Sequence, residues 1–196
     1  MIDLQTFLDI VEALRLAGFA DDDIQWSENC GPPENARAFA REAVFVICNS
    51  GMKATIARQI FLRVIQALSR GDSAFTVFKH PGKAGAIDQI WFEREQHFAS
   101  YQAAEDKLEF CASLPWIGAI TKYHLAKNFG VQVAKPDVHL QRLADREGCT
   151  AQALCERLAR ESGYKVATVD VLLWRACATG VIDSRTGRIS LPNTAE

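Results

Sequence analysis

The sequence predicts an all-α protein with two helical lobes. Apolar residues recur at spacings of three and four along almost the whole chain of 196 residues, as in helices that bury one face. The turn signals between these stretches are short, and no repeat or low-complexity linker divides the chain. With 48% apolar residues, residues 1–196 can bury a core as one unit. We therefore expect about nine helices with short connections, arranged as a two-lobed bundle.

The first half of the chain predicts three helices and one long loop. The first helix covers about residues 4–16 and ends before a glycine. The segment DDDIQWSENCGPPEN, residues 21–35, is expected to be a polar loop because it is acidic and contains Gly and Pro. A helix at residues 36–48 ends in the apolar run AVFVIC and is expected to be central. An apolar stripe from Ile56 to Leu68 predicts the next helix, which closes at Gly71.

The second half predicts shorter elements. HPGKAG is expected to be a turn, followed by short helices and by a helical hairpin whose turn and second helix cover residues 114–130. The tail DSRTGRISL alternates polar and apolar residues around Thr186 and Gly187, which predicts a small C-terminal β-hairpin. The predicted ranges are 80–85 for the turn, 87–91, 98–110, 138–144, 151–160 and 168–178 for the other helices, and 183–191 for the hairpin.

Composition excludes several classes of protein. The net charge of -2 gives no global positive field, so a nucleic-acid partner has to be bound by a local patch. The six cysteines are scattered without paired spacings, so we expect buried thiols and no metal site formed by side chains. No basic leader and no run of roughly 20 apolar residues occurs, so we expect a cytoplasmic protein without membrane contact. We also expect it to be a monomer.

Residues 113–122, SLPWIGAITK, form a turn that opens a helix. Pro115 fixes one φ angle, Gly118 permits a positive one, and the first amides of the following helix have no partner within it. Such amides and the helix dipole bind anions without a basic side chain. Lys122 and Lys127 on the same helix can add phosphate contacts, as can His124. The turn is therefore a candidate phosphate site.

Asp137 lies in the segment KPDVH and precedes the next apolar run. This is the N-cap position of a helix, where Asp is favoured for structural reasons alone. Taken alone, the residue pattern therefore favours this structural role, and a catalytic role depends on what the neighbouring segment resembles.

The segment LPWIGAITKYHLAKNFGVQVAKPDVHLQRLA, residues 114–144, resembles the helix-hairpin-helix element and catalytic aspartate of the DNA glycosylase superfamily. This superfamily, also called HhH-GPD, includes endonuclease III, the MutY-type adenine glycosylases and the 8-oxoguanine glycosylases. The residues in register are Leu114, Pro115, Ile117, Gly118, Thr121, Asp137 and His139. The resemblance places the hairpin at about residues 111–130 and the catalytic segment at 135–140.

The resemblance implies a two-lobed glycosylase-like fold that binds DNA and flips a nucleotide into a cleft between the lobes. Asp137 is the implied catalytic carboxylate, which stabilises the positive charge that develops on the sugar and orients a water molecule. No cofactor is required, with a monovalent cation at the hairpin turn as the one candidate ion. The implied DNA-binding residues are Leu114, Trp116, Ile117, Gly118, Ile120, Thr121, Lys122 and Lys127.

Two further segments resemble parts of the same enzymes. FVICNSGMKATIARQIF, residues 45–61, resembles the helix, loop and helix that place an intercalating wedge, here Asn49, Ser50, Gly51, Met52 and Lys53. VDVLLWRACATG, residues 169–180, resembles the last helix beneath the active site. Additional candidates for the base pocket are Trp26, which can stack on an extruded base, Lys135 and His139, whereas Trp91 and Trp174 are expected in the core.

Two departures from the family pattern concern the reaction. Trp116 replaces the first glycine of the turn, so the turn has to change conformation or expose an indole near DNA. Ile120 stands where bifunctional members carry the lysine that forms a Schiff base, and a hydrocarbon cannot attack a sugar. The resemblance therefore favours a monofunctional N-glycosylase acting on a damaged or modified base.

Two other functions remain open on the sequence alone. Some bacteriophage proteins with a glycosylase-like fold are implicated in thymine hypermodification, in which an amine or amino acid is added to an activated 5-hydroxymethyluracil in DNA. A transferase of this kind cuts no glycosidic bond, which also fits the absence of a lysine at Ile120. The third reading is a non-catalytic protein that binds DNA through the hairpin.

Overall fold

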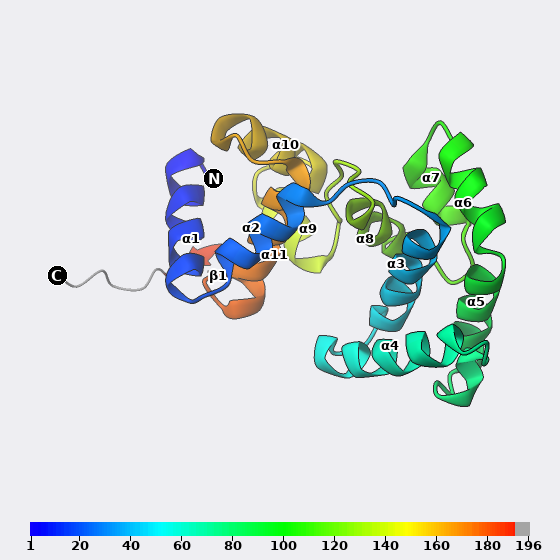
Figure 1. Ribbon diagram of the computed structural model, residues 1–196. Helices are drawn as coiled ribbons and strands as arrows, with labels where there is room; N and C mark the ends of the chain where they lie inside the picture. The colour runs from blue at the N-terminus through cyan, green and yellow to red at the C-terminus, as the bar shows by residue number, and fades with distance from the viewer. Residues whose placement is uncertain (191–196) are drawn as a thin grey trace. The chain divides into compact units, whose positions relative to one another are not determined.

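The computed structural model describes residues 1–190, apart from the side chain of Ala54, and this part of the chain is mainly helical (Figure 1). The all-α prediction is confirmed. The described residues contain eleven α-helices rather than nine, one 3-10 turn and two short strands. These are α1 (Leu4–Leu16), α2 (Ala20–Asn29), α3 (Ala36–Asn49), α4 (Ala54–Ser69), η1 (Ala74–Thr76), α5 (Pro81–Phe92), α6 (Arg94–Ala103), α7 (Lys107–Ser113), α8 (Thr121–Asn128), α9 (Val138–Arg146), α10 (Ala151–Ser162), α11 (Val166–Thr179), β1 (Ile182–Asp183) and β2 (Arg188–Ile189).

The chain forms two compact units. Residues 32–129 form one, here called the α3 unit, and residues 1–31 form the other with the described residues from 130 onward, here called the α11 unit. Each name is that of the helix at the centre of its unit. None of the helices in residues 1–190 is long and apolar enough to cross a membrane.

In the α3 unit, α3 packs against α4, α5, α6 and α8. The side chain of Asn35 caps α3 by accepting a hydrogen bond from the amide of Ala38 at 2.9 Å. Phe39 is fully buried, and its ring lies 5.2 Å from that of Phe129 and 5.7 Å from that of Tyr101. The predicted central position of this helix is confirmed, because its apolar face carries an aromatic core.

In the α11 unit, α11 packs against α1, α2, α9, α10 and β1. Leu172 and Leu173 are fully buried, in one core with Phe7, Leu140 and Leu154. β1 and β2 pair antiparallel, with Ile182 opposite Ile189, so the predicted C-terminal hairpin is confirmed. Leu191 of the predicted hairpin segment lies outside the described residues.

The predicted loop at residues 21–35 was wrong in its first part, because α2 occupies Ala20–Asn29. Three acids, Asp21, Asp22 and Asp23, fall in its first turn, where the helix dipole favours negative charge. Asp23 also accepts two hydrogen bonds from the Arg175 guanidinium, at 2.7 and 3.0 Å. The ion pair with Arg175 and the helix dipole thus stabilise a helix whose acidic sequence resembles that of a loop.

Two other boundaries also differ from the prediction. The segment expected to turn at residues 80–85 is the start of α5, with Pro81 at its first position and His80 Nδ1 accepting from the amide of Lys83 at 3.3 Å. The helix expected over residues 98–110 is divided into α6 and α7. Asp106 starts α7 as its N-cap and accepts from the amides of Leu108 and Glu109.

The aromatic core predicts that alanine substitutions at two phenylalanines of the α3 unit differ greatly in their effect on stability. Phe39→Ala removes a fully buried ring and is expected to lower the free energy of unfolding by about 3–5 kcal/mol. Phe92→Ala, at a side chain that is 54% exposed, should change it by less than about 0.5 kcal/mol. Urea unfolding of both variants measures the difference, and equal effects would contradict a core centred on Phe39.

Candidate nucleic-acid interface and active site

The hairpin turn lies between α7 and α8 and is anchored by two apolar side chains. Leu114 and Ile117 are buried, and the amide of Ile117 donates to the carbonyl of Leu114 at 3.1 Å. The positive φ expected at Gly118 occurs instead at Trp116, at 64°. No other non-glycine residue of the described chain has a positive φ. The turn thus keeps a conformation that favours glycine although a tryptophan occupies it.

Four consecutive amides after the turn are available to an acceptor. Within residues 1–190, the amides of Gly118, Ala119, Ile120 and Thr121 donate no hydrogen bond. Gly118, Ala119 and Ile120 are exposed, and nothing lies within 4 Å of the place where a Cβ on Gly118 would be. Because these amides lead into α8, the dipole of that helix adds to their attraction for an anion. The arrangement can hold a phosphate oxygen without any lysine.

The indole of Trp116 packs on the first turn of α5. A Cβ added to Gly82 would lie 2.2 Å from Cζ3 of Trp116, so only glycine at this position admits the indole. The ring of His80 lies edge-on to the indole, with 5.1 Å between centroids. Trp116 nevertheless remains 44% exposed. The predicted exposed indole at the turn is therefore present, on a rigid base formed by α5.

The two predicted phosphate-binding lysines of α8 differ. Lys122 Nζ donates to Glu109 Oε1 at 2.5 Å, and this bond raises the pKa of the lysine. Lys127 is buried, with 7% of its surface exposed, and its predicted contact with phosphate stays a prediction. The amides, rather than the lysines, are the clearest anion-binding feature of the hairpin.

The predicted wedge residues, 49–53, join α3 to α4. Gly51 has a φ of 66°, and the amide of Met52 donates to the carbonyl of Asn49 at 3.1 Å. Lys53 is exposed. The Nζ of Lys83, from α5, donates to the carbonyl of Ser50 at the end of α3.

Lys83 is a residue that sequence reasoning missed. It is 5% exposed, and its burial lowers the pKa of its ammonium group. A lysine that shares the buried face of a helix with Ile87, Ile90 and Trp91, at spacings of four, seven and eight, is the signal that could have found it. Its hydrogen bond ties the wedge residues to α5.

Asp137 is the N-cap of α9. Its Oδ1 accepts from the amides of His139 at 2.9 Å and Leu140 at 3.1 Å. The other oxygen, Oδ2, takes no part in the cap. The predicted N-cap is confirmed, and the cap leaves one carboxylate oxygen available for other partners.

The segment before Asp137 is held by side chains from two helices. The amide of Lys135 donates to Asp170 Oδ1 on α11 at 2.7 Å, and the amide of Ala134 donates to Gln152 Oε1 on α10 at 2.7 Å. Asp170 is 2% exposed. The amide of Asp137 closes a tight turn onto the carbonyl of Lys135 at 2.7 Å. The position of Asp137 is therefore fixed from both sides.

His139 and Cys177 complete the surroundings of Asp137. His139 Nδ1 lies 2.9 Å from the hydroxyl of the buried Ser184, so the ring is held next to the C-terminal hairpin. Burial raises the pKa of the Cys177 thiol to about 12, and the charges of Asp137 and Asp183 act in the same direction. The thiol stays protonated at neutral pH and is not a nucleophile.

The tryptophans are distributed differently from the prediction. Trp91 is buried, as expected, whereas Trp174 is 37% exposed, so its predicted core position is wrong. Trp26 lies on α2 rather than in a loop and is 47% exposed. Asp170, Trp174 and Cys177 recur at helical spacing and share one face of α11. Because Asp170 binds the Lys135 amide and Cys177 is close to the charge of Asp137, this face brings Trp174 near the Asp137 segment.

The predicted site residues fall into two groups. The hairpin and the wedge residues belong to the α3 unit, whereas Trp26, Lys135, Asp137 and His139 belong to the α11 unit. Among the described residues, no three His, Cys, Asp or Glu side chains cluster in a way that could hold a metal ion.

Neither a protein-family model nor a curated protein matches the sequence. The structure, however, aligns with a solved enzyme, the 8-oxoguanine DNA glycosylase of Thermotoga maritima. The alignment covers 87% of this chain and 93% of that one, with a TM-score of 0.52 and 16% sequence identity. The chain has a DNA glycosylase-like fold. The predicted fold is confirmed by this likeness.

The contact between Gly82 and Trp116 can be tested with two alanines on one helix. At Gly85 nothing lies within 4 Å of an added Cβ, so Gly85→Ala should stabilise α5 by about 0.5–1 kcal/mol. Gly82→Ala should lose this gain, because the indole has to leave α5, and should change the tryptophan fluorescence. Urea unfolding followed by fluorescence compares the two variants, and identical behaviour would argue against the packing described.

Proposed function

We propose that the protein is a DNA glycosylase-like enzyme that removes a damaged or modified base without cutting the strand. The fold likeness to a DNA glycosylase supports the class of enzyme. The observation that carries the proposal is the Asp137 carboxylate, one oxygen of which caps α9 while the other takes no part in the cap. The hydrogen bonds from Ala134 to Gln152 and from Lys135 to Asp170 hold the preceding segment, which fixes where this carboxylate lies.

In the proposed reaction, the four amides at residues 118–121 bind a phosphate of the strand and fix its position. A damaged or mismatched base leaves the stack at a cost of about a few kcal/mol, less than an intact pair requires. The extruded base stacks on an exposed tryptophan, for which Trp174 is the best placed because it shares a helix face with Asp170 and Cys177.

Asp137 then stabilises the positive charge that develops on the sugar as the glycosidic bond breaks, and it orients the attacking water. Since Cys177 stays protonated, Asp137 has no competing thiolate nucleophile beside it. The products are a free base and an abasic site. No cofactor is needed for this hydrolysis, and a monovalent cation at the hairpin turn would serve only in binding phosphate.

Analysis of nucleosides by mass spectrometry tests the proposal. Duplexes that carry oxidised, alkylated or hydroxymethylated bases are incubated with the protein, and free bases and intact nucleosides are both quantified. Release of one base supports the proposal. A new modified nucleoside would instead identify a base-modifying transferase, and binding without any change would identify a DNA-binding protein.

Replacing Asp137 by Asn separates its charge from its cap, because Asn is an equally good N-cap. We expect base release by Asp137→Asn to fall by about 10²- to 10⁴-fold, the range for a catalytic carboxylate, with thermal unfolding nearly unchanged. The matched control is Asp3→Asn, which changes the cap of α1, where Asp3 accepts from the amide of Thr6 at 2.8 Å. This control should keep full activity, and an equally active Asp137→Asn would refute the catalytic role.

Borohydride trapping tests the absence of a lyase step. With Ile120 in place of a lysine, the wild-type protein should give no covalent adduct on lesion DNA, whereas Ile120→Lys should gain trapping. Lys122 lies two residues further, roughly 200° around the helix, and is held by Glu109. If the wild type is trapped, then Lys53→Ala, Lys83→Ala and Lys135→Ala identify the lysine, and the assignment as monofunctional is wrong.

A further inference from the structure

The exposed face of α4 is basic, a feature that the proposed function does not use. Between Glu42 and Asp72 the sequence contains four basic residues and no acidic one. They are Lys53, Arg58, Arg63 and Arg70, here called the α4 basic face, and all four side chains are exposed. A helix of sixteen residues without one carboxylate forms no internal ion pairs, so no group within the helix neutralises its positive charges.

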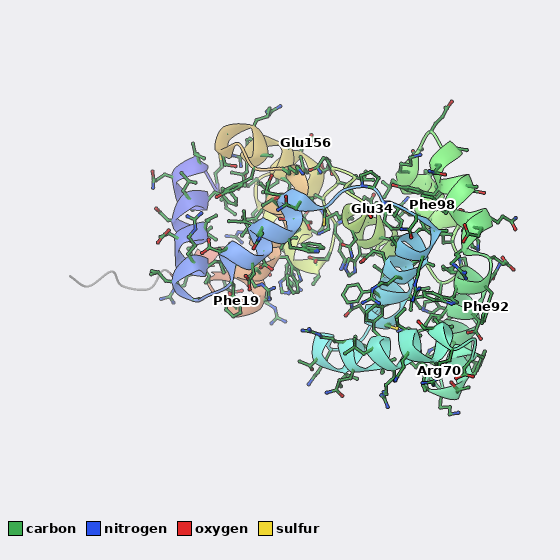
Figure 2. The ribbon with its side chains drawn as sticks, viewed as in Figure 1. Phe19, Glu34, Arg70, Phe92, Phe98 and Glu156 are labelled. Atoms are coloured by element: carbon green, nitrogen blue, oxygen red, sulfur yellow. The ribbon has the colours of Figure 1, made fainter. Side chains whose placement is uncertain are left out.

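These charges are largely uncompensated by the rest of the protein. Within residues 1–190, Lys53, Arg58 and Arg63 take part in no ion pair. Arg70 alone of the four is paired, with Asp72 at 3.1 Å, and both side chains are about half exposed (Figure 2). Solvent screens such a pair strongly, so it contributes little to stability and can open to another anion.

The charge is local to this part of the chain. The α3 unit has twelve lysines and arginines against nine acids, whereas the rest of the sequence has ten against fifteen. Many acids of the α3 unit lie on α6 and α7 or beside them, including Glu93, Glu95 and Glu109. The α4 basic face is therefore a concentrated patch on a protein of net charge -2.

The opposite face of α4 packs into the core of the α3 unit. Ala57, Phe61, Val64 and Leu68 are buried. The apolar side of this helix is therefore not available to enter a lipid bilayer, as it would be in a helix that lies on a membrane. What α4 exposes is two arginines, two glutamines, Thr55, Ser69 and a few apolar side chains, with Arg70 exposed at its C-cap.

The α4 basic face is connected to both proposed DNA-binding elements of the α3 unit. Lys53 is itself the last wedge residue and the N-cap of α4. Phe45 of α3 lies between the other two helices, with its ring 5.4 Å from that of Phe61 on α4 and 6.3 Å from that of His124 on α8. The helix that follows the hairpin turn and α4 thus pack on the same side chain of α3.

We infer that the α4 basic face binds DNA phosphates, as a second backbone contact besides the hairpin turn. From Lys53 to Arg70 the helix extends about 25 Å, which corresponds to roughly seven base pairs of duplex. Arg63 and Arg70 project within about 20° of each other around the helix, whereas Arg58 lies about 140° from Arg63, on the other flank of the exposed side. Their long side chains can reach phosphates from both flanks, and arginine is well suited to bind phosphate through pairs of hydrogen bonds. The inference rests on the proposed function, since it takes DNA as the ligand.

The dependence of DNA affinity on salt measures this contact. The amides of the hairpin carry no charge, so binding through the hairpin alone releases few counterions and gives a shallow slope in log K against log salt. The four charges of the α4 basic face add about -3.6, at roughly -0.9 per phosphate neutralised, so we expect a wild-type slope of at least about 3.6 in magnitude on an undamaged duplex. In Arg58→Gln/Arg63→Gln the magnitude should fall by about 1.8, at roughly 0.9 per phosphate contact.

The matched control, Arg160→Gln/Arg188→Gln, removes the same charge from exposed sites of the α11 unit and should leave the slope unchanged. Circular dichroism verifies the fold, and glutamine preserves the tendency of α4 to form a helix. An unchanged slope in the α4 variant, or an equal fall in the control, overturns the inference.

A third variant, Gly118→Asp, distinguishes failure of the inference about the α4 basic face from failure of the proposed function. It places a carboxylate at the open position beside the hairpin amides and should weaken binding in its own right. If Gly118→Asp weakens binding and the α4 variant does not, the proposed function stands without the α4 contact. If the wild type does not bind the duplex at all, both proposals fall.

Discussion

The buried carboxylate of Asp170 is the interaction on which the proposed active site depends. The chain between α8 and α9 has no regular structure, so its buried amides lack the partners that a helix would supply. Asp170 accepts the amide of Lys135 from α11, and Gln152 accepts that of Ala134 from α10. An unpaired buried amide costs about 1–3 kcal/mol, so two side chains determine the path of the chain into Asp137. The cap of α9 then fixes the carboxylate itself.

The hairpin of the α3 unit shows a different constraint, in which backbone strain is offset by packing. A residue other than glycine with φ near 64° costs about 1 kcal/mol or more, yet Trp116 adopts it. The strain is offset by the packing of the indole against Gly82, where any larger residue would collide with it, and by its edge contact with His80. Strain at an exposed turn that leads directly to four amides without partners is the kind of feature found at binding sites. Residues 80–82 and 114–121 are therefore best understood as one structural element.

The sequence predicts best those features that depend on near neighbours in the chain. Asp137 was found as an N-cap because a cap requires only its own position and the next three amides. The helix α2 was missed because its acids resemble a loop, and the helix is stabilised by Arg175, which lies far away in the sequence. The same reason applies to Lys83, whose burial was overlooked, and to Trp174, which was wrongly expected in the core. Which helices pack against a side chain decides whether it is buried, and these helices are distant in the sequence.

The distribution of charge is compatible with the proposed binding of DNA by a slightly acidic chain. The hairpin attracts an anion through dipoles, which contribute nothing to the count of charged residues. The α4 basic face carries four positive charges, but the excess of acidic residues in the α11 unit outweighs them, so the net charge of the chain is -2. A single net charge therefore describes neither surface, because attraction to phosphate falls off over about 8–10 Å at physiological salt. At that range a bound strand of DNA would respond to the charges of the helix that it contacts, and the charges that α4 exposes are all positive.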